Sequence, residues 1–198
     1  MNLDVEPLLT APPGGRPMGE RRFAIIGVGS AGSNVVDRLL DSGMGDVVFI
    51  AADTDTEALS TAQAPNHLQL TDDDASSELR DRLRYLLTDV TSVVLVVGLG
   101  GATGTRAAVQ FARLADSLGV EIIGVATTPF YFEGKRRRRL AEAGLASLTD
   151  AVDALFPLSN QRLLMELGAR SSLAQAFERA EDAMAREVVS VLQNLSAS

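Results

Sequence analysis

The chain has 198 residues, of which 46% are hydrophobic and 22% charged, which is the composition of one globular domain and not of a disordered or fibrous chain. The absence of cysteine excludes disulfides and thiolate metal sites, the single His67 argues against multi-histidine metal centres and triad hydrolases, and a net charge of -8 disfavours nucleic-acid binding. No apolar run is long enough to cross a bilayer and no secretion signal opens the chain, so we expect a cytoplasmic protein without a membrane span.

Residues 1–20 are predicted to be a flexible arm, because prolines and glycines interrupt any sustained period there. From Arg21 onward, short β-branched runs alternate with segments of helical spacing. We predict strands at 23–27, 47–52, 67–70, 93–97, 121–126 and 152–158, and helices at 33–40, 74–88, 105–118, 134–148, 161–167 and 171–195. This alternation predicts one α/β domain over residues 21–198, with a three-layer, doubly wound, mostly parallel and Rossmann-like sheet.

The first predicted strand runs into a glycine-rich segment, GVGSAGSN, in which Gly27, Gly29 and Gly32 match G-x-G-x-x-G. Such glycines permit a tight turn and close approach to a phosphate, which the N–H groups of the following helix attract. A dinucleotide-binding domain also places an acidic residue at the end of the second strand, where this chain has Asp53. The first segment therefore leaves NAD open as an alternative to other nucleotides.

A second glycine-rich segment, GLGGATGTR, follows the strand predicted at 93–97. Two phosphate-binding loops suit a nucleoside di- or triphosphate held from two sides, whereas an NAD site needs only one. Neither segment carries the Gly-Lys-Ser/Thr of a P-loop NTPase. Together, the two glycine-rich segments favour a nucleotide site at the carboxyl ends of the strands.

Five segments, GVGSAGSN, FIAADTDTEAL, GLGGATGT, TPFYFEGKRR and LSNQRLL, resemble in order and spacing the nucleotide-binding domain of the FtsZ/tubulin superfamily, whose FtsZ branch acts in cell division. The resemblance covers about residues 21–196 and implies a site for GTP or GDP, with Mg²⁺ as a candidate companion ion. The phosphate loops that it implies consist of Gly29, Ser30, Ala31, Gly32 and Ser33, and of Gly100, Gly101, Ala102, Thr103, Gly104 and Thr105.

The resemblance also implies residues for the rest of the nucleotide. Pro129, Glu133 and Arg137 would line the ribose and phosphate edge. Stacking of a base on an aromatic ring contributes ~1–3 kcal/mol, and a carboxylate accepts the paired N–H donors of guanine. The residues that would contact the base are Asn34, Asn160, Phe177 and Asp182.

The sequence departs from the family pattern at three places near the phosphates. TDDDASSE replaces a glycine-rich loop that contacts the terminal phosphate in the family, Asp53 stands where the family has Asn, and Arg106 stands where the signature ends in Gly. The Asp53 carboxylate would repel phosphates and Arg106 would attract them, so we expect an altered charge balance at the site.

The chain ends at Ser198, after the long helix that in the family leads to a second domain bearing the catalytic acidic loop. We expect a domain that binds nucleotide without self-sufficient hydrolysis or filament formation, because phosphoryl transfer needs groups that position water and stabilise charge. It would act as an interaction module on an FtsZ-type partner, or self-associate through its C-terminal helix. The alternatives are a nucleotide-free scaffold, an NAD-binding protein, and a weak divergent GTPase that uses Asp53, Asp55 or Asp72 to Asp74.

Two segments bear on possible partners. The basic run at 135–139 is interpreted as a solvated helix face, with an acidic partner or nucleotide phosphates as alternatives. One apolar stripe of the C-terminal helix can cover the sheet, and the remaining apolar residues would face water or a partner. The residues in question are Leu173, Phe177, Met184, Val188, Val189, Val191, Leu192 and Leu195.

Overall fold

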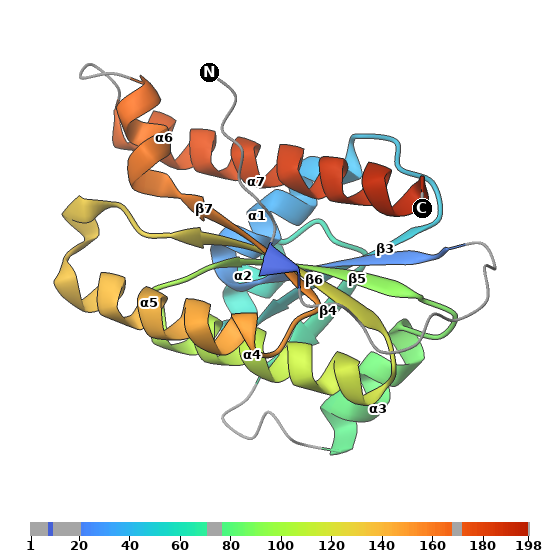
Figure 1. Cartoon of the computed structure of the whole chain (residues 1–198). Helices are drawn as coiled ribbons and strands as arrows, with labels where there is room; N and C mark the ends of the chain where they lie inside the picture. Colours follow the sequence, from blue (N-terminus) through green and yellow to red (C-terminus); the bar gives the residue numbers. More distant parts are fainter. Residues whose placement is uncertain (1–7, 10–20, 71–76, 168–171, 198) are drawn as a thin grey trace.

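Strands and helices alternate along the chain, and in the computed structural model they form three layers (Figure 1). The structure describes residues 8–9, 21–70, 77–167 and 172–197. The strands are β1 (Leu8–Leu9), β2 (Phe23–Val28), β3 (Val47–Asp53), β4 (Asn66–Gln69), β5 (Ser92–Gly98), β6 (Glu121–Thr128) and β7 (Ala154–Ser159). The helices are α1 (Gly29–Leu40), α2 (Thr56–Thr61), α3 (Ser77–Leu86), α4 (Ala102–Ser117), the 3-10 turn η1 (Tyr131–Glu133), α5 (Lys135–Thr149), α6 (Asn160–Leu167) and α7 (Leu173–Ser196).

The strands of the described part of the chain form one sheet in the order β1-β7-β6-β5-β2-β3-β4. β2 pairs in parallel with both β3 and β5, and β4, β6 and β7 continue the parallel arrangement on either side. β1 pairs with β7 in the antiparallel sense. The chain thus winds to one side of β2 and then to the other, which confirms the predicted doubly wound, mostly parallel sheet.

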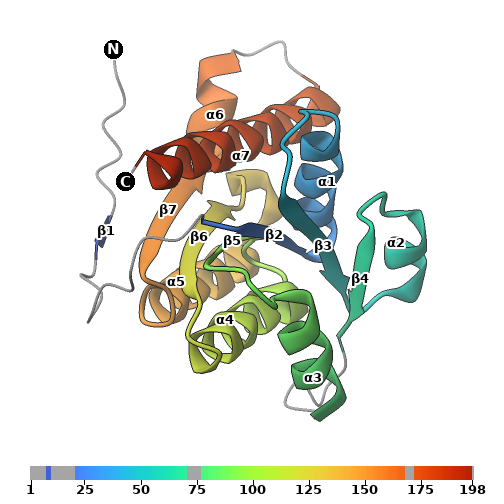
Figure 2. The ribbon, with the colours of Figure 1, turned by 90° about the vertical axis from the view of Figure 1, so that its right-hand side faces the viewer.

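Helices cover both faces of the sheet (Figures 1 and 2). Val35 of α1 and Met184 of α7 share one core cluster, whereas Leu83 of α3, Phe111 of α4 and Leu148 of α5 share the other. A fully buried aliphatic side chain of this size contributes about 1.5–3 kcal/mol to folding. Because both faces are covered, the central strands are apolar on both sides, which explains runs such as residues 93–97.

The predicted elements exist, with corrections at their ends. The helix predicted at 33–40 begins at Gly29, so the GSAG tetrapeptide forms the first turn of the helix instead of a separate loop. The six residues of α2 were not predicted; Asp55 caps this helix by accepting from the N–H groups of Glu57 and Ala58. The C-terminal helix starts at Leu173, where the Ser172 hydroxyl accepts from Gln175 N and the Gln175 side chain accepts from Ser172 N. The start predicted at 74 lies outside the described residues, and α3 is described from Ser77.

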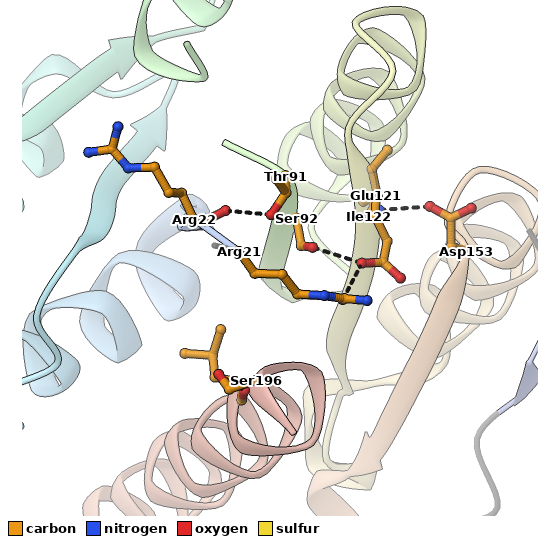
Figure 3. A network of polar contacts seen from close by, with 9 residues as sticks. Arg21, Arg22, Thr91, Ser92, Glu121, Ile122, Asp153 and Ser196 are labelled. Carbon is orange, nitrogen blue, oxygen red and sulfur yellow. Dashed lines mark hydrogen bonds and ion pairs between the residues drawn. The ribbon is translucent and has the colours of Figure 1, made fainter. Parts of the chain in front are cut away.

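Polar contacts tie the amino ends of neighbouring strands together (Figure 3). The Glu121 carboxylate at the start of β6 accepts from Arg21 Nη1 at 3.2 Å and from Ser92 Oγ at 2.7 Å, which joins the starts of β2, β5 and β6. Ile122 N donates to Asp153 Oδ2 at 2.7 Å, so the residue before β7 is joined as well. These contacts lie at the amino ends, which leaves the opposite edge of the sheet for loops with other roles.

Within the described residues, no helix is long and apolar enough to cross a membrane.

Candidate nucleotide site

Both glycine-rich segments lie at the carboxyl edge of the sheet, because β2 and β5 are parallel neighbours and each runs directly into a segment that starts a helix. From there α1 leads to β3 on one side and α4 leads to β6 on the other. In doubly wound sheets, ligands bind at this point, where the strand order reverses. Ala31 and Gly98 bring the two segments into contact, since a Cβ at Gly98 would lie 3.0 Å from Ala31 Cβ.

The first segment, Gly29 to Asn34, forms the opening turns of α1. Gly29 has a φ of +72°, and Val28 before it offers no side-chain acceptor to the first N–H groups of the helix. A side chain at Gly32 would collide with the carbonyl oxygen of Val96, so its glycine lets α1 pack directly against β5. Ser33 Oγ is buried and has no hydrogen-bond partner within the described residues. These opening turns therefore present N–H groups and the positive end of the helix dipole toward the edge.

The second segment turns at Gly100, whose φ is +106°, and α4 begins two residues later without a side-chain cap. Gly100 N donates to the buried hydroxyl of Thr105 at 3.0 Å, so Thr105 fixes the shape of the loop. A Cβ at Gly101 or Gly104 would have no atom within 4 Å. The loop therefore borders open space on the side of its glycines. The side chains of Ala102 and Thr103 lie outside the described part of the structure.

The loop after β6 packs against this second segment. A Cβ at Gly100 would lie 3.3 Å from Pro129 Cγ and 3.0 Å from Arg137 O. Glu133 accepts from Phe130 N at 2.8 Å and forms an ion pair with Arg137 at 3.0 Å. Pro129, Glu133 and Arg137 are thus brought together beside Gly100, and part of the basic run is paired.

An aromatic cluster joins this loop to α7. Phe177 meets the rings of Phe130 and Phe132 edge-on, at centroid distances of 5.1 and 6.3 Å, and keeps 43% of its surface exposed. Tyr131 N donates to Gln161 Oε1 at 3.0 Å, which attaches the same loop to the start of α6. Asn160, the first residue of α6, is 7% exposed, and its Oδ1 has no partner within the described residues. An exposed ring and an unpaired buried amide oxygen therefore lie around one loop.

Asn34 and Arg38, one turn apart on α1, contact two adjacent carboxylates of α7. Asn34 Nδ2 donates to Glu181 Oε1 at 2.7 Å. Arg38 donates to Glu181 Oε2 from Nε and Nη2, at 3.1 and 2.7 Å, and to Asp182 Oδ1 from Nη1 at 2.9 Å. The hydrogen bond to Glu181 is the main cause that raises the pKa of Arg38. Asp182 is thus held on α7 next to α1, and neither Arg38 nor Glu181 was singled out from the sequence.

The acidic residues Asp53 and Asp55, at and after the end of β3, accept hydrogen bonds from nearby backbone N–H groups. Asp53 ends β3 at the same edge, and its Oδ1 accepts from Asp55 N at 3.1 Å. Asp55 is the cap of α2. Asp72 to Asp74 lie outside the described residues. Within the described residues, no group of three or more His, Asp or Glu is placed to hold a metal ion.

The apolar residues predicted on the C-terminal helix divide into two sets. Met184, Val188, Val191 and Leu192 are buried against the sheet, and Val189 and Leu195 are partly buried against the same core cluster. Leu173 is 60% exposed near the start of α7. Leu173 and Phe177 lie in the first turns of α7, and exposed Tyr131 lies in η1, whose Phe132 contacts Phe177. The burial of the first set confirms the prediction that one apolar stripe of the C-terminal helix covers the sheet.

Comparisons with known proteins agree with this architecture. A family model described as the GTPase domain of the Tubulin/FtsZ family matches residues 22–167. The cell division protein FtsZ of Coxiella burnetii is 36% identical over 178 residues, which cover 82% of this chain and 46% of that protein. FtsZ of Pseudomonas putida is 36% identical over 179 residues, covering 83% and 45%. The chain spans about half the length of the curated relatives it matches.

Solved structures show the same fold. An empty FtsZ dimer of M. jannaschii superposes with a TM-score of 0.77 at 27% identity, over 86% of this chain and 54% of that one. CetZ2 of Haloferax volcanii, solved as a GTPγS-bound protofilament, superposes with a TM-score of 0.68 at 21% identity, over 86% and 58%.

Proposed function

Because the chain belongs to the tubulin/FtsZ family, we propose that it binds a guanine nucleotide, GTP or GDP, at the carboxyl edge of its sheet. The observation that supports this most strongly is the meeting of two uncapped helix N-termini, those of α1 and α4, from adjacent parallel strands. Unpaired N–H groups and helix dipoles attract phosphate. The open space at Gly101 and Gly104 would let phosphate oxygens approach the backbone.

The base would lie at the end where α6 and α7 meet the loop after β6. The Phe177 side chain is 43% exposed, so its ring would be available for stacking, and its contacts with Phe130 and Phe132 orient it. Asn160 Oδ1 is a buried acceptor without a partner in the described chain, so a ligand donor there would satisfy a group that is otherwise costly to bury. Asp182 is partly exposed and offers a carboxylate to the N–H groups of guanine. The residues present fit a guanine nucleotide.

We propose that the chain binds nucleotide and hydrolyses it slowly or not at all by itself. Two carboxylates considered for catalysis, Asp53 and Asp55, already accept hydrogen bonds from backbone N–H groups, since Asp53 accepts from Asp55 N and Asp55 caps α2. Carboxylates engaged in this way are poor candidates for positioning an attacking water. A Mg²⁺ ion would be bound mainly by phosphate oxygens and water, as is usual for this cation.

We further propose that the nucleotide edge contacts a second protein of the FtsZ type, or another copy of this chain. Solved relatives are described as an FtsZ dimer and a CetZ2 protofilament. Tyr131, 63% exposed, and Phe132 project from the loop beside the proposed site, and exposed aromatics are typical anchors of protein interfaces. Sedimentation of a full-length FtsZ with and without this chain tests the proposal. Wild-type chain should change the amount or length of polymer, and Tyr131→Ser should weaken that effect.

The nucleotide itself is tested by calorimetric titration of nucleotide-free protein with GTP, GDP, ATP and NAD in the presence of Mg²⁺. We expect GTP and GDP to bind with micromolar dissociation constants, and ATP and NAD to give no binding heat. Equal affinities for GTP and GDP would agree with the expectation that TDDDASSE has replaced the loop that contacts the terminal phosphate in the family. Binding heat with NAD alone would favour the alternative of an NAD-binding protein. Binding heat with none of the four nucleotides would favour a nucleotide-free scaffold. Phosphate release at GTP saturation distinguishes a binding domain from a divergent GTPase.

A further inference from the structure

We propose that Arg38 is the positioning residue that gives the base end its preference for guanine, by fixing the Asp182 carboxylate from α1. The inference rests on the proposed guanine site and deepens it. It concerns a residue outside every sequence motif of that site, whose partners are more than 140 positions away in the chain.

Arg38 makes three of its hydrogen bonds to two neighbouring carboxylates. Nε and Nη2 both donate to Glu181 Oε2, and Nη1 donates to Asp182 Oδ1 at 2.9 Å. A guanidinium is planar, so occupying three of its nitrogens fixes its orientation, and with it the carboxylates that it contacts. Asn34 adds a further hydrogen bond at 2.7 Å to the other oxygen of Glu181. The side chain of Glu181 is only 16% exposed, and it is the anchor of this cluster.

The cluster leaves one carboxylate oxygen available. Asp182 Oδ1 accepts a hydrogen bond from Arg38, whereas Oδ2 has no hydrogen bond within the described residues, and the side chain is 46% exposed. A carboxylate accepts several hydrogen bonds, so Asp182 can hold Arg38 and still receive donors from a ligand. Fixing one oxygen also lowers the conformational entropy that the side chain loses when a ligand binds.

The charges of α7 explain why a cation is needed at this place. Glu181 and Asp182 are adjacent, and Glu178 precedes Asp182 by one helical turn, so three negative groups surround Arg38. Like charges at such distances repel one another, and Arg38 offsets this repulsion by pairing with Glu181 and Asp182.

The consequence is a specificity that depends on the exocyclic amino group of guanine. Guanine presents adjacent N1–H and N2–H donors, hypoxanthine lacks the N2 amino group, and adenine presents an acceptor at N1. A group oriented for two donors rejects analogues that lack one of them. The ratio of GDP to IDP affinity therefore reports on the orientation of Asp182, whereas loss of overall structure would lower both affinities alike.

The experiment measures dissociation constants of GDP, IDP and ADP for wild type, Arg38→Ala, Arg38→Lys and the matched control Arg84→Ala. Arg84 also pairs with an aspartate, Asp81, one turn away on α3, but both side chains are mostly exposed to solvent. Arg38→Ala should weaken GDP binding about tenfold or more, as expected for loss of a charge-assisted contact, and should bring the GDP to IDP ratio close to one. Arg38→Lys, which keeps the charge and loses the planar fork, should give an intermediate ratio. Arg84→Ala should match wild type.

A folded Arg38→Ala protein with the wild-type ratio of GDP to IDP would overturn the inference and leave the guanine site intact. If Arg38→Ala does not fold, judged by circular dichroism, an unchanged ratio in Arg38→Lys overturns it equally. Wild type that binds neither GDP nor GTP would instead overturn the proposed function itself, so the two failures are distinct.

Discussion

At the scale of single residues, the site is built from groups whose hydrogen bonds are complete and from a few whose bonds are not. Thr105, Glu133 and Arg38 already have protein partners and therefore hold the loops in place. Ser33 and Asn160 each bury an oxygen without a partner in the described residues. A buried polar atom without a partner costs about 1–3 kcal/mol, so a ligand that supplied one would recover part of this free energy.

Asn160→Ala separates these two roles. Because Asn160 Oδ1 has no partner to lose within the described residues, the free energy of unfolding should not fall, while GDP affinity falls about tenfold. Urea unfolding and calorimetric titration measure the two quantities. The matched control is Asn66→Ala: Asn66 Nδ2 donates to Phe49 O at 3.0 Å, so that variant should lose about 1 kcal/mol of stability and keep its GDP affinity. The reverse pattern would assign Asn160 a purely structural role.

At the scale of elements, the helix starts carry the proposed chemistry, and they are where interpretation of the sequence was least accurate. G-x-G-x-x-G is a strand-to-helix junction as predicted, but the helix starts within it: Gly27 lies in β2, and Gly29 to Gly32 already belong to α1. The sequence rule for caps would have found α2, since Asp55 precedes Glu57 and a short apolar period. No local pattern could have identified Arg38, because its partners lie on a distant helix and only the tertiary packing of α1 on α7 brings them together.

Gly104→Ala tests the start of α4. A Cβ at Gly104 would meet no protein atom within 4 Å, so the helix should gain about 0.5–1 kcal/mol from the higher helix propensity of alanine. If phosphates occupy that space, the same methyl group should weaken GDP binding about tenfold or more, as overpacking of a contact does. Thermal unfolding and GDP titration are the measurements. Gly45→Ala, which also meets nothing within 4 Å and lies away from the site loops, is the control for binding and should leave GDP affinity unchanged.

Glu187 on α7 gives a pH dependence. Burial raises the pKa of Glu187, so the folded state retains this proton at pH values where the unfolded chain has released it. The stabilisation from the protonated form is present below the unfolded pKa and is lost as the pH rises through the folded pKa. Glu187→Gln should therefore unfold at a higher temperature than wild type at pH 7, with the difference vanishing near pH 4. A variant that is less stable than wild type at pH 7 would contradict this assignment.

At the scale of the whole molecule, the number of the six parallel strands and their parallel direction could be predicted from the sequence. Continuous apolar runs indicate strands that are buried on both faces, as in a parallel sheet. The family could be identified from five ordered motifs, and the family model agrees. The arrangement of the base end could be predicted only through that resemblance. The contacts among Phe130, Phe132 and Phe177 depend on how a loop and two helices pack, which no sequence period encodes.

Ligand linkage gives a prediction for the molecule as one cooperative unit. If GDP binds only the folded chain, a concentration of 100 times its dissociation constant should stabilise the protein by about 2.7 kcal/mol and raise its melting temperature by several degrees. ATP at the same concentration should leave the melting temperature unchanged. Differential scanning calorimetry at a series of GDP concentrations measures this shift. Equal shifts of the melting temperature with ATP and GDP would show that the site recognises the phosphates and not the base.

The strand pairing at the edge of the sheet has a consequence for the behaviour of concentrated protein. An unpaired edge strand presents free N–H and C=O groups on which another molecule can add its own strand. Here β1, although only Leu8–Leu9, pairs with Leu155 and Ala154 of β7, and the opposite edge is the four-residue β4, which alternates exposed and buried positions. β1 thus covers the first two residues of β7, and proteolytic removal of Leu8–Leu9 should expose that part of the edge to neighbouring molecules.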